Sequence, residues 1–109
     1  MISIYDNATI DIISASVDSW GTRTESVAYP NLSVRTEPVN KPVIGKDGQE
    51  LMAQTLIIIS DDDTIIGWDD KIKIKTIDGD DVETKDKQYV IKSKFKAPGF
   101  VSSHWEVYI

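Results

Sequence analysis

Residues 51–59 (LMAQTLIII) constrain the fold more than any other part of this chain. The segment is short and almost continuously apolar, and it is closed by Ser60 and the acidic residues 61–63. Such a run is typical of a strand that is buried on much of both faces, and it is short for a helix. We therefore predict a central strand here. A short helix within residues 45–53 is the alternative, because Glu, Leu, Met, Ala and Gln are good helix formers.

The rest of the chain carries strand signals at intervals of roughly ten residues. Residues 71–77 alternate most strictly, with isoleucines on one face and lysines on the other. Further segments of β-type composition are residues 8–15, 24–29, 32–35, 88–95 and 103–109. Pro30 limits pairing at its position to an edge or a bend. This pattern predicts an all-β fold, a small barrel or sandwich of about six to seven short, mostly antiparallel strands.

Residues 38–48 (PVNKPVIGKDG) contain two prolines and two glycines, which argue against a regular element running through them. We predict a long surface loop near residues 39–50. Long loops in compact domains often bind a partner, so Val39, Lys41, Val43 and Lys46 are candidate contact residues. A mobile hairpin tip is the alternative.

Length and composition place the chain among single globular domains, with residues 1–109 as one unit. The chain has 109 residues, of which 40% are hydrophobic and 28% are charged, and it contains no cysteine, so neither a disulfide nor a thiolate metal site is available. Its formal net charge of −6 works against a groove that grips duplex DNA. The first residues lack the basic start of a secretion signal, and no run has the length of a membrane span, so we expect no membrane association.

No catalytic constellation stands out. The aspartates at 61–63, 69–70 and 78–81 lack the ligand spacing of a calcium loop, so we interpret them as solvated turns rather than as a Ca²⁺ or Mg²⁺ site. The single histidine, His104, has no recognisable triad partners, and we expect it, with Tyr108, at an interface on the last strand. We predict a protein that is not an enzyme, with no cofactor and no bound metal.

Three tryptophans are many for a chain of this size. Trp105 falls on the apolar face of the last strand, which favours a core position. Trp20 and Trp68 each adjoin a glycine at a turn, so we expect them to be core lids or interface anchors. A small barrel that binds carbohydrate or peptide through these two tryptophans is an alternative function.

The order of motifs resembles the head-tail connector proteins of tailed bacteriophages, the head-completion or stopper group. The shared features are Tyr-Asp at 5–6, Trp-Gly at 20–21, Asp-Lys-Ile at 70–72, Asp-Gly at 78–79 and the ending His-Trp-Glu-Val-Tyr-Ile at 104–109. The resemblance covers nearly the whole chain through short motifs.

The resemblance implies a β-barrel virion protein of the phage neck. Such proteins form a homo-oligomeric ring, a dodecamer or hexamer, between the portal or adaptor and the tail, where the ring closes the DNA-filled head and serves as the tail attachment platform. DNA would pass through the lumen without specific binding, which suits an acidic chain. The loop near residues 39–50 would match the position of a channel loop in the family. A tail terminator is the nearest alternative, although those chains tend to carry a long helix, for which there is no pattern here.

Overall fold

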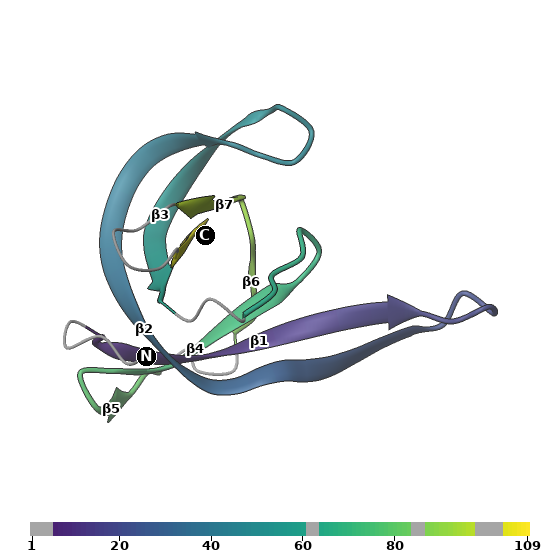
Figure 1. Cartoon of the computed structure of the whole chain (residues 1–109), viewed down its shortest axis with the longest axis horizontal. Helices are drawn as coiled ribbons and strands as arrows, with labels where there is room; N and C mark the ends of the chain where they lie inside the picture. The colour runs from purple at the N-terminus through teal and green to yellow at the C-terminus, as the bar shows by residue number, and fades with distance from the viewer. Residues whose placement is uncertain (1–5, 61–63, 84–86, 98–103) are drawn as a thin grey trace.

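The computed structural model describes residues 6–60, 64–83, 87–97 and 104–109, and in them the chain is all-β (Figure 1). Eight antiparallel strands form one sheet in the order β5-β4-β1-β2-β3-β8-β7, with β6 paired to β4. The strands are β1 (Ala8–Val17), β2 (Arg23–Ile44), β3 (Glu50–Ile59), β4 (Lys71–Ile77), β5 (Asp80–Asp81), β6 (Tyr89–Val90), β7 (Ser93–Ala97) and β8 (His104–Tyr108). The predicted all-β fold class is confirmed. The barrel alternative is wrong, since the sheet does not close, and the arrangement is consistent with a sandwich. The alternative of a helix within residues 45–53 is wrong.

The long strand β2 belongs to both halves of the sheet. Its first part pairs with β1 from Arg23 to Val34, and its second part pairs with β3 from Arg35 to Ile44. Figure 1 shows β2 curving continuously from one half to the other. One half-sheet therefore contains β1, β4, β5 and β6, the other contains β3, β8 and β7, and β2 joins them.

Irregular pairing produces part of this curvature. Between Ile10 and Ile12 of β1, the partner strand advances three residues, from Leu32 to Tyr29. The extra residue forms a bulge, and Asn31 there has a positive φ of 53°. Asp11 supports the bulge, because its carboxylate accepts a hydrogen bond from the Asn31 N–H at 2.9 Å. The prediction of an edge or a bend at Pro30 is confirmed, since Pro30 lies within this register shift and is unpaired in the β1–β2 register.

The predicted long loop at residues 39–50 is wrong. β2 continues to Ile44, β3 starts at Glu50, and the two are joined by a tight turn in which the Gly45 N–H donates to the Gln49 carbonyl at 2.9 Å. The prolines are tolerated because this part of β2 pairs with β3 alone among the described strands, and a proline with no N–H to donate fits an open edge. Pro38 also adjoins a register shift in the pairing of β2 with β3. The segment is thus a hairpin rather than a loop.

One main core joins the two half-sheets. It is formed by aliphatic residues of β1, β2, β3, β4 and β8 and of the segments that follow β3, β6 and β8. Its members are Ala8, Ile10, Ile12, Val34, Ile57, Ile59, Ile66, Ile72, Ile74, Ile91, Val107 and Ile109. β3 pairs on both sides, with β2 and with β8, and Ile57 and Ile59 are fully buried. The prediction of a central buried strand at residues 51–59 is therefore confirmed, as is the alternation of residues 71–77, where Ile72 and Ile74 face the core.

Candidate interaction site on the projecting arm

The β1–β2 hairpin extends beyond the rest of the sheet as a two-stranded arm, which we define as residues 14–26 (Figure 1). β1 pairs with β4 only as far as Ile13, so beyond that residue its one described partner is β2. No side chain of the arm is buried. A lone hairpin is at best marginally stable in water, so an arm of this kind gains from contact with another molecule.

The tip of the arm is ordered by its own hydrogen bonds. The Asp18 carboxylate accepts from the N–H groups of Trp20 and Thr22, both at 2.9 Å, and the Asp18 carbonyl accepts from the Gly21 N–H at 3.1 Å. Gly21 has a φ of +80°, which a residue with a Cβ adopts only with strain. The turn therefore holds its shape before any partner binds.

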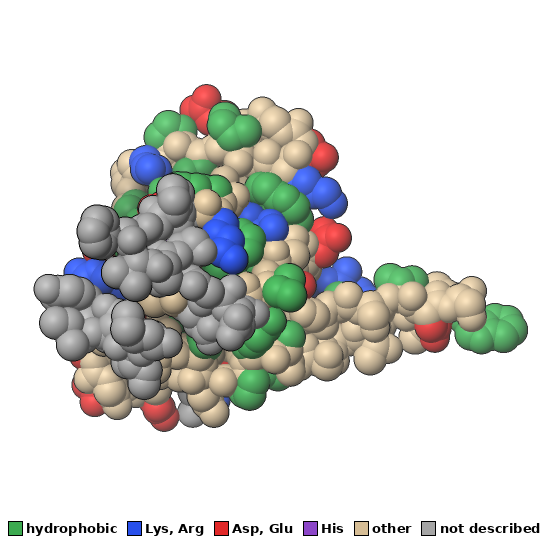
Figure 2. Space-filling model, viewed as in Figure 1, with side chains coloured by type: hydrophobic (Ala, Val, Ile, Leu, Met, Phe, Trp, Pro, Cys, Tyr) green, Lys and Arg blue, Asp and Glu red, His purple; other side chains and the backbone are tan. Residues whose placement is uncertain are grey.

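This turn presents a large apolar side chain to solvent. Trp20 is 90% exposed, and the neighbouring Val17 is 66% exposed. Figure 2 shows a hydrophobic group at the far end of the arm, separated from the globular part of the molecule. Trp20 is thus not a core lid, and its role as an interface anchor stays a prediction.

One ion pair joins the base of the arm to β4, and a second lies within β2 itself. The Glu25 carboxylate lies 3.4 Å from the Lys71 ammonium and 3.4 Å from the Arg23 guanidinium. The hydrogen bond and the charge of Lys71, with a smaller contribution from Arg23, lower the pKa of Glu25 below its ordinary value of 4.5. The direction of the arm is therefore partly set by charge.

Because the pKa of Glu25 is lower in the folded chain than in the unfolded chain, the Lys71 pair stabilises the fold above pH 4.5. That stabilisation is lost as the pH falls through the folded-state pKa. We expect Lys71→Met to raise the pKa of Glu25 toward its ordinary value, measured by NMR titration of the side-chain carboxyl. Lys73→Met on the same strand is the control and should leave the pKa of Glu25 unchanged; an equal shift in both variants would contradict the pairing.

The candidates from the predicted loop mostly belong to a second, smaller core. Val43 and Tyr108 are buried there, and Val39 packs against it. The Lys41 ammonium lies 4.8 Å from the centre of the Tyr108 ring. Lys46, in the turn after β2, lies 3.8 Å from the Asp69 carboxylate. Val43 and Tyr108 therefore stabilise the fold and are not available as contact residues.

Trp68 and Trp105 flank a lysine of their own chain. The Lys94 ammonium lies 5.4 Å from the centre of the Trp68 ring and 5.0 Å from that of Trp105, and it donates to the Ile66 carbonyl at 2.6 Å. Trp105 also donates from Nε1 to the Thr64 carbonyl at 2.8 Å. Both rings pack against the main core, as predicted for Trp105. A bound cation could not take the position between the two rings, because the Lys94 ammonium already lies there.

We expect Lys94→Ala to lower the free energy of unfolding by about 1 to 3 kcal/mol, because it removes the cation and a charged hydrogen-bond donor from half-buried partners. Chemical denaturation measures this change. Lys73→Ala, a lysine on β4 outside this cluster, should change stability by less than about 0.5 kcal/mol. Equal effects of the two variants would show that Lys94 is an ordinary surface lysine.

The described residues do not gather into a metal or acid–base site. No group of three or more His, Asp or Glu side chains among them could hold a metal ion. His104 lies 3.7 Å from Glu106, and no third described Asp, Glu or His completes a metal site with them. Asp70 accepts a hydrogen bond from the Gly67 N–H at 2.8 Å, as expected of a turn residue. The acidic residues 61–63 lie outside the described residues, as does Tyr5.

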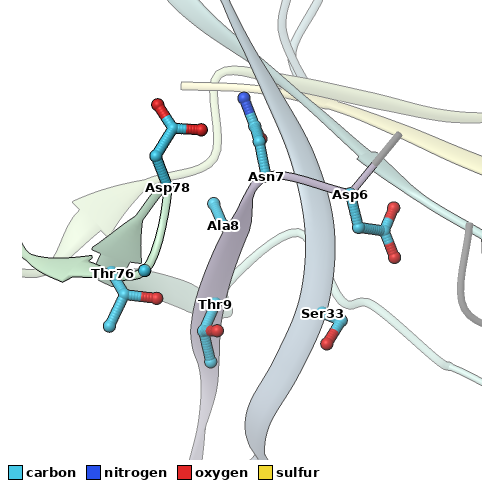
Figure 3. Close-up of a pocket in the computed structure, with 8 residues that line it drawn as sticks. Asp6, Asn7, Ala8, Thr9, Ser33, Thr76 and Asp78 are labelled. Atoms are coloured by element: carbon cyan, nitrogen blue, oxygen red, sulfur yellow. The ribbon is translucent and has the colours of Figure 1, made fainter. Parts of the chain in front are cut away.

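One polar cavity of about 340 Å³ lies beside the start of β1 (Figure 3). Asp6, Asn7, Ser33, Thr76 and Asp78 are among its lining residues. The carboxylates of Asp6 and Asp78 lie on opposite sides of Asn7 and point away from each other (Figure 3). The cavity therefore does not bring two carboxyl groups to a common point, as acid–base chemistry on one substrate would require.

The folded core thus does not explain the presence of the arm, because none of the side chains of the arm is buried. In the part of the chain that the structure covers, no helix has the length and hydropathy to span a bilayer. Comparisons with protein-family models, with curated proteins and with solved structures find no match to this chain.

Proposed function

We propose that this chain is a structural subunit of a tailed-phage neck, with no catalytic role. In this proposal its copies form a ring between the portal or adaptor and the tail, close the DNA-filled head and provide the platform for the tail. The observation that supports an assembly role most directly is the arm, whose ordered tip exposes Trp20 to solvent. The phage context rests on the motif order of the sequence.

Two other properties favour assembly over chemistry. The main core stabilises the globular part without any contribution from the arm, so the arm is free to bind a partner. The net charge of −6 disfavours retention of DNA that moves past the protein. The protein would accordingly reside in the virion after assembly in the host cytoplasm.

Carbohydrate or peptide binding through Trp20 and Trp68 receives less support. Trp68 packs against the core with Lys94 over its ring, whereas Trp20 is at the end of the arm. The two rings therefore do not form one exposed platform.

The test is an amber mutation in the gene for this chain, made in the phage that encodes it. Electron microscopy of the lysate should show DNA-filled heads that lack tails, together with free tails of normal length, and purified chain added to the lysate should restore infectious particles. Tails of abnormal length would point to a tail terminator. Complete, infectious virions made without the chain would refute a neck role.

A further inference from the structure

We propose that the arm tip of one copy docks into a cavity between β3 and β6 of a second copy, an inference that rests on the proposed function as a ring subunit. The cavity has a volume of about 190 Å³, and its lining includes Thr55, Lys87, Tyr89, Val90, Lys92 and Ile109.

The tip has no place to bury Trp20 within its own chain. At 90% exposure the indole contacts almost nothing, and the arm points away from the globular part (Figures 1 and 2). The hydrogen bonds of Asp18 fix the turn in this presentation. A partner for Trp20 must therefore come from another molecule, and the order already present at the tip lowers the entropic cost of binding it.

The cavity suits a single aromatic side chain. Its volume of about 190 Å³ is below the range of roughly 300 to 1,000 Å³ that is usual for small-molecule sites. Its wall offers apolar area, since Val90 is 63% exposed and Tyr89 is half-buried. The Lys87 ammonium lies 5.0 Å from the centre of the Tyr89 ring, so a cation is already positioned beside aromatic surface. An indole that enters would meet apolar contacts and a positive charge, which favours tryptophan among the aromatic residues.

Charge is complementary between the two surfaces. Residues 17–22 at the tip contain one acidic residue, Asp18, and no basic residue. The described residues that line the cavity include Lys87 and Lys92 and no Asp or Glu. A neighbouring cavity of about 250 Å³ is more apolar, but its described lining offers no lysine to Asp18, and Glu37 in that lining is already paired with Arg35 at 2.7 Å. The lysine-lined cavity is therefore the better receptor for the tip.

The tip and the cavity are different surfaces of one chain, so the contact joins copies head to tail. A head-to-tail contact leaves a free tip on one copy and a free cavity on the other, so it repeats and gives a ring where the rotation between copies closes and an open filament where it does not. This geometry matches the ring of the proposed function without requiring a twofold symmetric interface.

Cysteine cross-linking tests the contact directly, because the natural chain contains no cysteine. Ser19→Cys, next to Trp20, is mixed with Val90→Cys in the cavity under mild oxidation with copper phenanthroline. We expect a disulfide-linked dimer of the two variants. Ile44→Cys, which is 58% exposed on the β2–β3 hairpin, is the control receptor and should give little product with Ser19→Cys. Equal cross-linking to positions 44 and 90, or none to either, would overturn the proposal.

Association of the untagged chain gives a second readout. Trp20→Ser and Lys92→Glu should each raise the dissociation constant for self-association by at least about 10-fold in sedimentation experiments, as expected for hot-spot residues. Asp18→Asn keeps a carbonyl acceptor for the turn but removes its charge, so it should weaken association and make it less dependent on salt. Unchanged melting temperatures would show that the variants remain folded. Association of Trp20→Ser equal to that of the natural chain would overturn the proposal.

The two proposals fail in different ways. Tailless heads in the amber mutant, without cross-linking between positions 19 and 90, would refute this contact and leave the neck role intact. Cross-linking together with normal virions in the amber mutant would support the contact and refute the neck role.

Discussion

Replacing Ile57 with alanine should lower the free energy of unfolding by about 3 to 5 kcal/mol, toward the upper end of the range for such substitutions. Ile57 is fully buried on β3, where it pairs with Thr36 of β2 and with Val107 of β8. Because strands flank it on both sides, the neighbouring backbone cannot collapse into the cavity that the substitution creates. Urea unfolding followed by circular dichroism measures the change.

A loss of this size is a large part of the roughly 5 to 15 kcal/mol that stabilises an ordinary domain. Ile65→Ala is the matched control, because Ile65 is 75% exposed and its truncation should change stability by less than about 0.5 kcal/mol. If the two variants lost similar stability, the two half-sheets would not share the core described above.

We expect Asn7→Ala to be the second severe change, with a loss of about 2 to 3 kcal/mol. The Asn7 side chain makes two hydrogen bonds to the backbone of Thr36, as a neighbouring strand would. Thr36 lies where β2 stops pairing with β1 and pairs with β3. The Asn7 Oδ1 accepts from the Thr36 N–H at 2.7 Å, and its Nδ2 donates to the Thr36 carbonyl at 3.1 Å. Thr36 is buried, so alanine at position 7 leaves both of its backbone groups without these partners.

Asn7→Asp is the informative companion to this variant. An aspartate keeps the acceptor for the Thr36 N–H but places a negatively charged oxygen against the Thr36 carbonyl, which repels it, so we expect a loss at least as large as that for alanine. Amide exchange at Thr36 should be much faster in Asn7→Ala than in the natural chain. Unchanged exchange at Thr36 would mean that Asn7 does not hold the crossover of β2.

The sequence predicts well what depends on local burial. Residues 51–59 are apolar because β3 has neighbours on both sides, and residues 71–77 alternate because one face of β4 meets the core. Each of these two patterns can be recognised within its own segment, without knowledge of the partner strands. Gly21 and the Trp-Gly turn are local in the same sense, and the turn at residues 18–21 is where the sequence predicts it.

The features that the sequence does not predict depend on distant partners. Pro38 and Pro42 argue against a strand only where both edges of that strand must form hydrogen bonds with neighbouring strands. One edge of this part of β2 is open, and residues 38–48 alone do not reveal this. Trp68 faces Lys94, a residue of β7, so its ring contact is a tertiary feature. The projection of the arm depends on β4 ending its pairing at Ile13. A signal for the arm does exist in its small and polar residues, Ser14 to Ser16 and Thr22 to Ser26, which suit a hairpin exposed on both faces.

Sedimentation velocity of the full-length natural chain across a wide concentration range, with electron microscopy of the peak fractions, tests the central claim most directly. A subunit whose arm tip binds a second copy should form larger species as concentration rises, with closed rings among them. A chain that stays monomeric at every concentration, and so leaves its arm tip exposed to solvent, would contradict this claim.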